Sequence, residues 1–186
     1  MIPNKEKSID ILNKYIIKNP NLDHCYMVAY GMQGVAKYYD LNKEEQDYWF
    51  VVGLLHDIDI EKFSGDISEH CLVGEKILLE ENIDQQVIDD IKSHNVVLNV
   101  GRNTTLRKAL YSTDVLTGII RAYVLIRPDK DVKQTKVKSI LKKIKDKTFA
   151  SNINRDQIRL CEISLNIELN KFIEVVLNEI KDNYSI

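Results

Sequence analysis

Apolar residues recur along most of the chain at the three- and four-residue spacing of an amphipathic α-helix. Polar stretches, with Pro20, Gly65, Gly101 and Pro128 among them, separate these runs. The pattern predicts eight helices, over residues 5–18, 23–39, 42–56, 68–81, 84–94, 104–127, 133–147 and 154–182. Only the triplet 96–98 has strand character, and it is too short to indicate a sheet. The predicted fold class is therefore all-α, a bundle of about eight helices.

The predicted helix over residues 42–56 has apolar side chains on every face near its C-terminal end, which is typical of a central, buried helix. Asn42 followed by Glu45 predicts a capping box at its start. Gly53 within it is expected to allow close packing against a neighbouring helix. The helix ends on His56 and Asp57, which places a carboxylate in the interior, where such groups are usually paired or bound to metal.

A chain of 186 residues suits a single domain. We expect a core over about 20–127 and a C-terminal helical extension over about 129–186. The segment 133–147 is predicted to be an amphipathic helix with a face of lysines. Whether these lysines face a site, a partner or water is left open by the pattern.

Charge and composition narrow the class of protein. With 26 basic and 28 acidic residues, the net charge of -2 indicates neither a nucleic-acid polymer nor a membrane as partner. The three cysteines are widely spaced and form no disulfide framework, and no apolar run approaches the roughly 20 residues of a membrane span. The N-terminus lacks a signal-like apolar stretch. A cytoplasmic protein is expected, and the oligomeric state stays open.

The chain has four histidines, and each lies at or near an end of a predicted helix. Together with two aspartates they form a candidate ligand set of His24, His56, Asp57, His70, His94 and Asp114. Cys25 and Cys71 each follow one of these histidines. Because neighbours on a helix point about 100° apart, both cysteines are expected to pack in the core.

The order His, His-Asp, His, His, Asp after an apolar helix resembles the HD-domain superfamily of metal-dependent phosphohydrolases, with His56-Asp57 as its signature pair. The run 54–59 is similar to the HDIG subgroup, with Asp59 in place of the glycine. The segments 114–127, 147–150 and 154–155 further resemble a small branch of predicted HD hydrolases.

The resemblance implies a metal site and a set of possible ions. His24, His56, Asp57 and Asp114 would hold one metal, and His70 and His94 would add a second, with Asp57 bridging the two. Imidazole and carboxylate donors suit Fe, Mn, Zn, Co or Ni, and Mg is also compatible. One or two divalent ions are therefore expected. If His70 and His94 are not ligands, they are helix-end histidines that bind substrate phosphate or cap a carbonyl.

Charged residues near these motifs are the candidates for catalysis and substrate binding. Asp57, Asp59 and Glu61 are the catalytic candidates; Asp59 and Glu61 would orient ligands or protonate the leaving group, unless they are solvated loop acids. Arg121, Lys147 and Arg155 would bind the substrate phosphate. For the lysine, the alternative is a solvated surface position.

The expected function is hydrolysis of a small phosphate ester or nucleotide, with water activated by metal as the nucleophile. The same six ligands also resemble those of the mixed-valent di-iron oxygenases of the superfamily. A third possibility is a non-catalytic HD module that binds metal or ligand. A P-loop, a Rossmann glycine pattern, a His-Glu-x-x-His motif and a Gly-x-Ser-x-Gly motif are all absent from the sequence.

Overall fold

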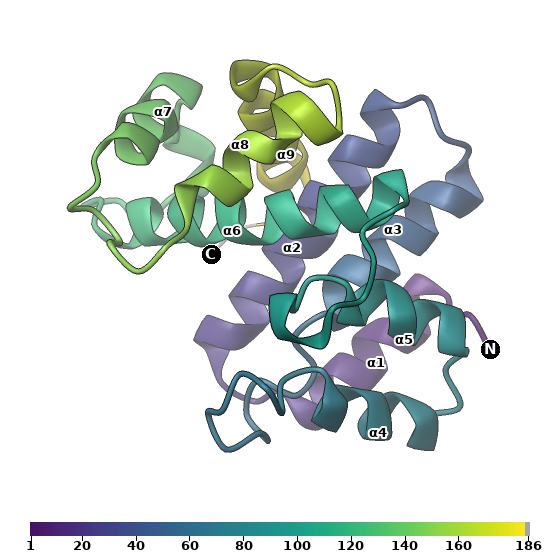
Figure 1. Cartoon of the computed structure of the whole chain (residues 1–186). Helices are drawn as coiled ribbons and strands as arrows, with labels where there is room; N and C mark the ends of the chain where they lie inside the picture. The colour runs from purple at the N-terminus through teal and green to yellow at the C-terminus, as the bar shows by residue number, and fades with distance from the viewer. Residues whose placement is uncertain (185–186) are drawn as a thin grey trace.

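The computed structural model describes residues 1–184, and in this part of the chain the fold is all-α, as predicted (Figure 1). Its nine α-helices are α1 (Lys5–Tyr15), α2 (Asn19–Tyr38), α3 (Lys43–Leu55), α4 (Leu72–Glu80), α5 (Gln85–Lys92), α6 (Thr105–Leu125), α7 (Val137–Lys145), α8 (Arg155–Ser164) and α9 (Leu169–Asn183). Two short 3-10 turns, η1 (Val96–Leu98) and η2 (Val132–Gln134), lie between them. The triplet 96–98 is therefore a helical turn and not a strand.

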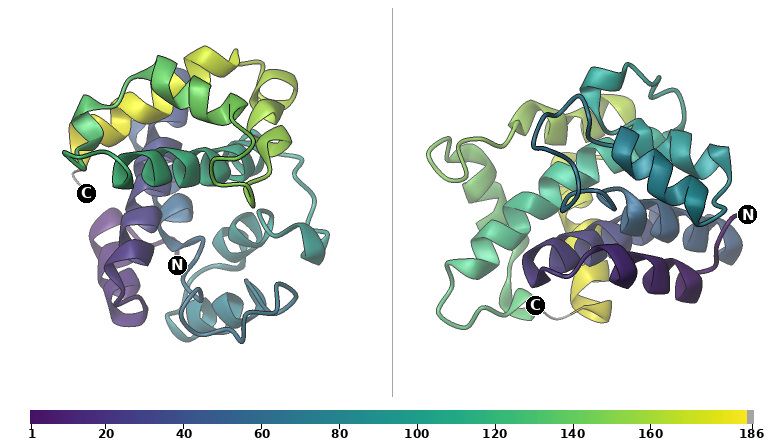
Figure 2. Two further views of the ribbon diagram at one scale, coloured as in Figure 1. Left: turned by 90° about the vertical axis from the view of Figure 1, so that its left-hand side faces the viewer. Right: turned by 90° about the horizontal axis from the view of Figure 1, so that it is seen from below.

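Helices α2 and α3 form the centre of the bundle. Helix α2 packs against α3, α6 and α9, and α1 covers another side of α3. The C-terminal helices lie at one end of the molecule and α4 at the opposite end (Figures 1 and 2). One hydrophobic cluster runs through all of these helices, from Ile11 in α1 to Ile180 in α9. The C-terminal part is thus packed on the same core as the rest.

Glycines set how closely the central helices approach. A Cβ added to Gly53 of α3 would lie 3.0 Å from the Cα atom of Ala29 and 3.0 Å from the carbonyl oxygen of Val28, both in α2. A residue with a side chain would fit here only if α2 moved by a few tenths of an ångström, so glycine suits this contact. The predicted packing role of Gly53 is confirmed, and it fixes α3 directly beside the helix that carries His24.

The predicted capping box at the start of α3 is also confirmed. Asn42 Oδ1 accepts a hydrogen bond from the Glu45 backbone N–H at 3.0 Å, and Glu45 Oε2 accepts one from the Asn42 N–H at 3.1 Å. The helix ends at Leu55, and His56 is its C-cap. The His-Asp pair therefore stands at the point where the buried helix stops.

Helix α2 begins at Asn19, four residues before the predicted start at Asp23. Pro20 lies in the first turn, where its missing N–H leaves no hydrogen bond unmade. Residues 19–21, which were predicted to lie between two helices, are therefore the first residues of α2.

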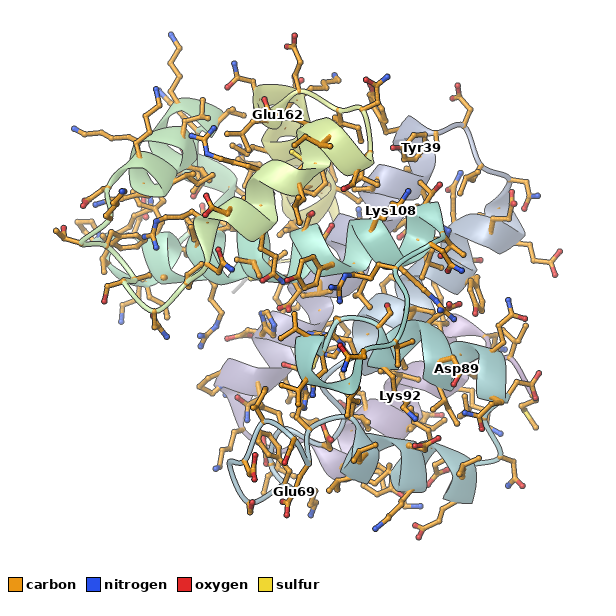
Figure 3. The ribbon with its side chains drawn as sticks, in the orientation of Figure 1. Tyr39, Glu69, Asp89, Lys92, Lys108 and Glu162 are labelled. Atoms are coloured by element: carbon orange, nitrogen blue, oxygen red, sulfur yellow. The ribbon has the colours of Figure 1, made fainter. Side chains whose placement is uncertain are left out.

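Helix α4 begins at Leu72 and not at Ser68, and His70 lies in the preceding turn. Asp59 explains the shift, because its Oδ2 accepts hydrogen bonds from the N–H groups of Cys71 at 2.7 Å and Gly74 at 2.9 Å. A carboxylate distant in sequence thus caps the helix in place of Ser68. An ion pair at 2.7 Å between Glu75 of α4 and Lys92 of α5 joins these two helices. Figure 3 labels Lys92, together with Asp89 of α5 and Glu69 before α4.

The single helix predicted over 154–182 is two helices, α8 and α9. Helix α8 ends because Asn166 adopts a left-handed conformation, with φ of 54°, and the Ile167 N–H donates back to the Cys161 carbonyl at 3.1 Å. Asparagine is a common residue at such a C-terminal cap. Elsewhere, no helix within residues 1–184 has both the length and the apolar character that crossing a bilayer requires.

Candidate metal centre

The structure brings the six predicted ligands together from five segments. His24 comes from α2, His56 and Asp57 from the end of α3, and Asp114 from α6; His70 precedes α4 and His94 follows α5. They lie at the base of a pocket of about 410 Å³, and all of them except His56 line it. His56 is buried beneath the pocket with 1% of its surface exposed.

Asp57 is at the centre of this cluster. Its Oδ1 lies 3.4 Å from His56 Nε2, 3.3 Å from His70 Nε2 and 3.4 Å from His94 Nε2. Its Oδ2 lies 3.7 Å from His24 Nε2. Oδ1 therefore faces three of the histidines and Oδ2 faces the fourth, an arrangement that is compatible with a bridging ligand.

Asp114 completes the side of the cluster formed by α2 and α3. Its Oδ1 lies 3.1 Å from His24 Nε2 and 3.8 Å from His56 Nε2. The groups His24, His56 and Asp57, and His56, His94 and Asp114, each place three possible ligand atoms within 4.8 Å of one another. This spacing is compatible with ligation of a single ion.

Three of the histidines are oriented through Nδ1. His56 Nδ1 lies 2.8 Å from the Gly53 carbonyl oxygen and His94 Nδ1 lies 2.6 Å from that of Ile91. His70 Nδ1 lies 2.9 Å from Asp59 Oδ1. Each acceptor requires a proton on Nδ1, which leaves the Nε2 lone pair directed into the cluster.

The unpaired nitrogen atoms fit a cation. His56 Nε2 is buried and has no hydrogen-bond partner. His70 Nε2 and His94 Nε2 face each other at 2.9 Å, so two lone pairs meet unless a proton or a metal ion lies between them. Four imidazoles with two carboxylates are a donor set for divalent transition metals. The residues present therefore fit one or two such ions.

The pKa values show the charge balance of the cluster. Burial opposes ionisation of Asp57, but the neighbouring His56, His70 and His94 hold its pKa well below the usual range. Burial likewise opposes protonation of His70, yet hydrogen bonds to Asp57 and Asp59 raise its pKa to about 12. Carboxylates and imidazolium protons thus stabilise one another, and a metal ion would displace those protons on binding.

Asp59 does not face the pocket. Its side chain is fully buried, Oδ1 accepts from His70 Nδ1, and Oδ2 accepts from the N–H groups of Cys71 and Gly74. Because both oxygens are occupied, the expected role as general acid is incompatible with this placement. Asp59 instead orients His70, which was the other role considered for it.

Glu61 lies outside the pocket as well. Its carboxylate accepts hydrogen bonds from the Lys18 N–H at 2.9 Å and the Asn21 side chain at 2.9 Å. It satisfies donors at the N-terminus of α2, as a capping residue does. The catalytic role expected for Glu61 is therefore replaced by a structural one.

The predicted phosphate-binding residues do not line the pocket. The Arg155 guanidinium donates to the backbone carbonyls of Asp146, Phe149, Ala150 and Ile153, so it holds the loop before α8 together. Lys147 is exposed on the surface. Arg121 is half-buried; burial and the charge of Arg121 oppose protonation of the nearby His24, but Asp114 and Asp57 outweigh them and raise the pKa of His24.

Several pocket residues were not predicted. The walls are formed by Ile60, Phe63 and Ile67 before α4 and by Asn152, Ile153 and Gln157 around the start of α8. Asn95 is also new: its side chain donates to the carbonyls of Ile67 at 2.8 Å and His70 at 2.9 Å, and so fixes the turn that carries His70. Its position directly after His94 was the only sequence signal.

The two cysteines that follow ligand histidines differ in the structure. Both are buried, as expected. Cys25 continues the regular helix α2 beyond His24, whereas Cys71 adopts a left-handed conformation and its Sγ lies 3.9 Å from His94 Nε2. The prediction from helical spacing, that each cysteine points away from the ligand histidines, therefore holds for Cys25. It was wrong for Cys71, whose sulfur lies beside His94.

The comparisons with known proteins agree with this geometry. The family model of the HD domain matches residues 21–119, a range that contains all six candidate ligands. No curated protein and no solved structure matches the chain significantly. The match does not show whether the protein belongs to the HDIG subgroup, so that assignment stays a prediction. Since the matched segment spans more than half of the chain, the protein belongs to the HD-domain family.

Proposed function

We propose that the protein is a metal-dependent phosphohydrolase that acts on a small phosphate ester or nucleotide. One observation carries the proposal: four histidine Nε2 atoms and two carboxylates converge on the base of an open pocket of about 410 Å³. A purely structural metal site is closed by protein ligands, whereas a catalytic site keeps positions open for water and substrate.

The proposal includes two metal positions, which the number of donors supports. His24, His56, Asp57 and Asp114 would hold one ion, and His70, His94 and Asp57 the other. When bound, such ions supply Lewis-acid chemistry and lower the pKa of water. The chain itself contributes the orientation of the ligands, through the Nδ1 contacts of three histidines, and a partly apolar wall around the substrate.

The pocket lining indicates how charge is distributed between substrate and protein. Among the described residues that line it there is no lysine or arginine, and its only carboxylates are those of Asp57 and Asp114. The positive charge that complements a phosphate would therefore come from the metals and not from side chains. This favours a substrate with one phosphoryl group and an uncharged remainder that contacts Phe63, Ile67 and Ile153.

The test compares protein loaded with Mn²⁺, Co²⁺, Fe²⁺, Zn²⁺, Ni²⁺ or Mg²⁺ on a panel of phosphomonoesters and nucleotides, with phosphate release as the measurement. Asp57→Asn is expected to abolish release and metal binding together. Asp89→Asn, on the outer side of α5 (Figure 3), is the matched control and should leave both unchanged. A fully metal-loaded protein that releases no phosphate from any ester would overturn the proposal.

A second candidate function is an oxygenase with a mixed-valent di-iron centre. The observation that favours it is the donor set itself, because four imidazoles and two carboxylates, one of them the central Asp57, suit two iron ions. Oxygen consumption by the iron-loaded protein would support this function. Equal turnover with Mn²⁺ in strict anaerobiosis would exclude it.

A further inference from the structure

Cys71 lies against the second metal position, beside His70 and His94. Its Sγ lies 3.9 Å from both ring nitrogens of His94, and the ligand atoms of Cys71, His70 and His94 all lie within 4.8 Å of one another. Sulfur and nitrogen ligands of one tetrahedral ion are separated by roughly 3.6 Å, given Zn–S and Zn–N bonds of about 2.3 and 2.0 Å. The Sγ–Nε2 separation exceeds this value by about 0.3 Å, and because Sγ is equally far from both ring nitrogens, a change of the Cys71 side-chain rotamer would be needed to bring the thiol onto an ion bound at Nε2.

The backbone explains why two successive residues can point to one place. Cys71 has φ of 68° and ψ of −21°. This left-handed conformation changes the direction of the backbone between His70 and Leu72, the first residue of α4. Its N–H is held by Asp59 Oδ2 at 2.7 Å, while Asp59 Oδ1 holds His70 at 2.9 Å. One buried carboxylate therefore fixes both His70 and Cys71.

We propose that the Cys71 thiolate is a ligand of the second metal ion, together with His70, His94 and Asp57. The inference rests on the metal centre proposed above and adds a soft donor to it. Thiolate ligands favour Zn²⁺, Co²⁺ or Fe²⁺ over Mg²⁺, for which oxygen donors are preferred. The second position would therefore select a borderline transition metal.

The position of the thiol is compatible with an active centre. Cys71 is 1% exposed and does not line the pocket, unlike His70 and His94. A bond from its sulfur would occupy the side of the ion that faces the protein interior. With these four protein ligands, an ion that expands to five-coordination would keep its fifth position, on the side that faces the pocket, for water and substrate.

Cobalt gives a direct readout, because a thiolate bound to Co²⁺ produces a charge-transfer band in the near ultraviolet. The experiment titrates metal-free protein with Co²⁺ under reducing, anaerobic conditions and records absorption for wild type, Cys71→Ser and Cys25→Ser. Cys25 is the matched control, since it is also buried and also follows a ligand histidine. The band is expected in wild type and Cys25→Ser and lost in Cys71→Ser.

The outcomes separate this inference from the proposed function. Weak visible bands from bound Co²⁺ without any near-ultraviolet band in wild type would overturn the Cys71 assignment and leave the histidine and aspartate centre standing. A band that persists in Cys71→Ser would overturn it as well, because another thiol would then be the ligand. Absence of Co²⁺ binding to wild type would overturn both this inference and the proposed metal centre.

Discussion

Asp59 Oδ1 accepts a hydrogen bond from His70 Nδ1 at 2.9 Å, and the carboxylate that makes this contact is fully buried. Its other oxygen caps α4 through the N–H groups of Cys71 and Gly74. The orientation of a metal-ligand candidate and the start of a helix therefore depend on the same side chain. The negative charge of Asp59 strengthens both contacts, because one oxygen accepts the Nδ1–H of His70 and the other accepts the N–H groups at the start of α4.

Replacing Asp59 by asparagine should weaken the second metal position selectively. The amide NH₂ would face backbone N–H donors or the His70 Nδ1–H, so at least one hydrogen bond is lost. Contacts of this kind typically change metal affinity by about 10–100-fold. Titration calorimetry with Co²⁺ should show one weakened site and one unchanged site, whereas two unchanged sites would contradict the role of Asp59. Glu69→Gln, in the exposed segment before α4 (Figure 3), is the control.

The rate of hydrolysis should depend steeply on the leaving group. With Asp59 and Glu61 engaged elsewhere, the acidic side chains that line the pocket are the ligand candidates Asp57 and Asp114. Without another side chain to protonate the departing oxygen, esters of acidic alcohols should react faster. Steady-state kcat/KM for aryl phosphates of graded phenol pKa, compared with alkyl phosphates, measures this. Equal rates across the series would indicate a general acid.

Gly53→Ala should destabilise the fold by about 1–2 kcal/mol, because the new methyl group overlaps the backbone of α2 and the gain in helix propensity offsets only part of the cost. Urea denaturation of the metal-free protein measures the change. Gly101→Ala is the matched control: nothing lies within 4 Å of an added Cβ there, so its effect should stay within about 0.5 kcal/mol. Equal effects of the two substitutions would contradict the close contact between α2 and α3.

Glu61→Gln should reduce stability in a pH-dependent manner. Burial opposes ionisation of Glu61, but hydrogen bonds from Asn21 and from the backbone of Lys18 and Ile17 outweigh it and lower its pKa from 4.5. A carboxylate with a lowered pKa stabilises the fold fully above 4.5, and this contribution is lost as the pH falls through the folded-state value. Chemical denaturation at a series of pH values should show a difference between wild type and variant that disappears in acid. Turnover should be retained, which a catalytic Glu61 would not allow.

Much of the helix pattern could be predicted because it depends on local signals, and the six ligand candidates, whose binding of metal stays a prediction, were chosen because their order resembles that of the HD-domain family. The apolar run before His56 and the capping box at Asn42 are visible in a few residues, and both are present in the structure. The start of α4 could not be predicted from Ser68, because the groups that cap it belong to Asp59, at a distance set by tertiary packing. The break between α8 and α9 had one local signal, Asn166, which an otherwise continuous apolar pattern concealed.

Side-chain roles were harder to predict than positions. Asp59, Glu61 and Arg155 are charged groups near the motifs. The hydrogen-bond partners of Asp59 lie 11 to 15 residues away in the chain, those of Glu61 40 to 44, and those of Arg155 2 to 9. A charged residue that already binds backbone groups is not available to a substrate. Only the folded structure distinguishes these cases from a free catalytic group.

One wall of the pocket is built by Asn152, Ile153 and Gln157, which lie beyond the last residue of the HD match at 119. The loop that carries this wall is held by Arg155 and not by any metal-ligand candidate. This wall and the ligand candidates thus come from separate stretches of the chain, although other wall residues, such as Phe63 and Ile67, lie within the HD match. Substitutions within residues 152–157 are therefore expected to change the shape of the pocket while they leave all six ligand candidates in place.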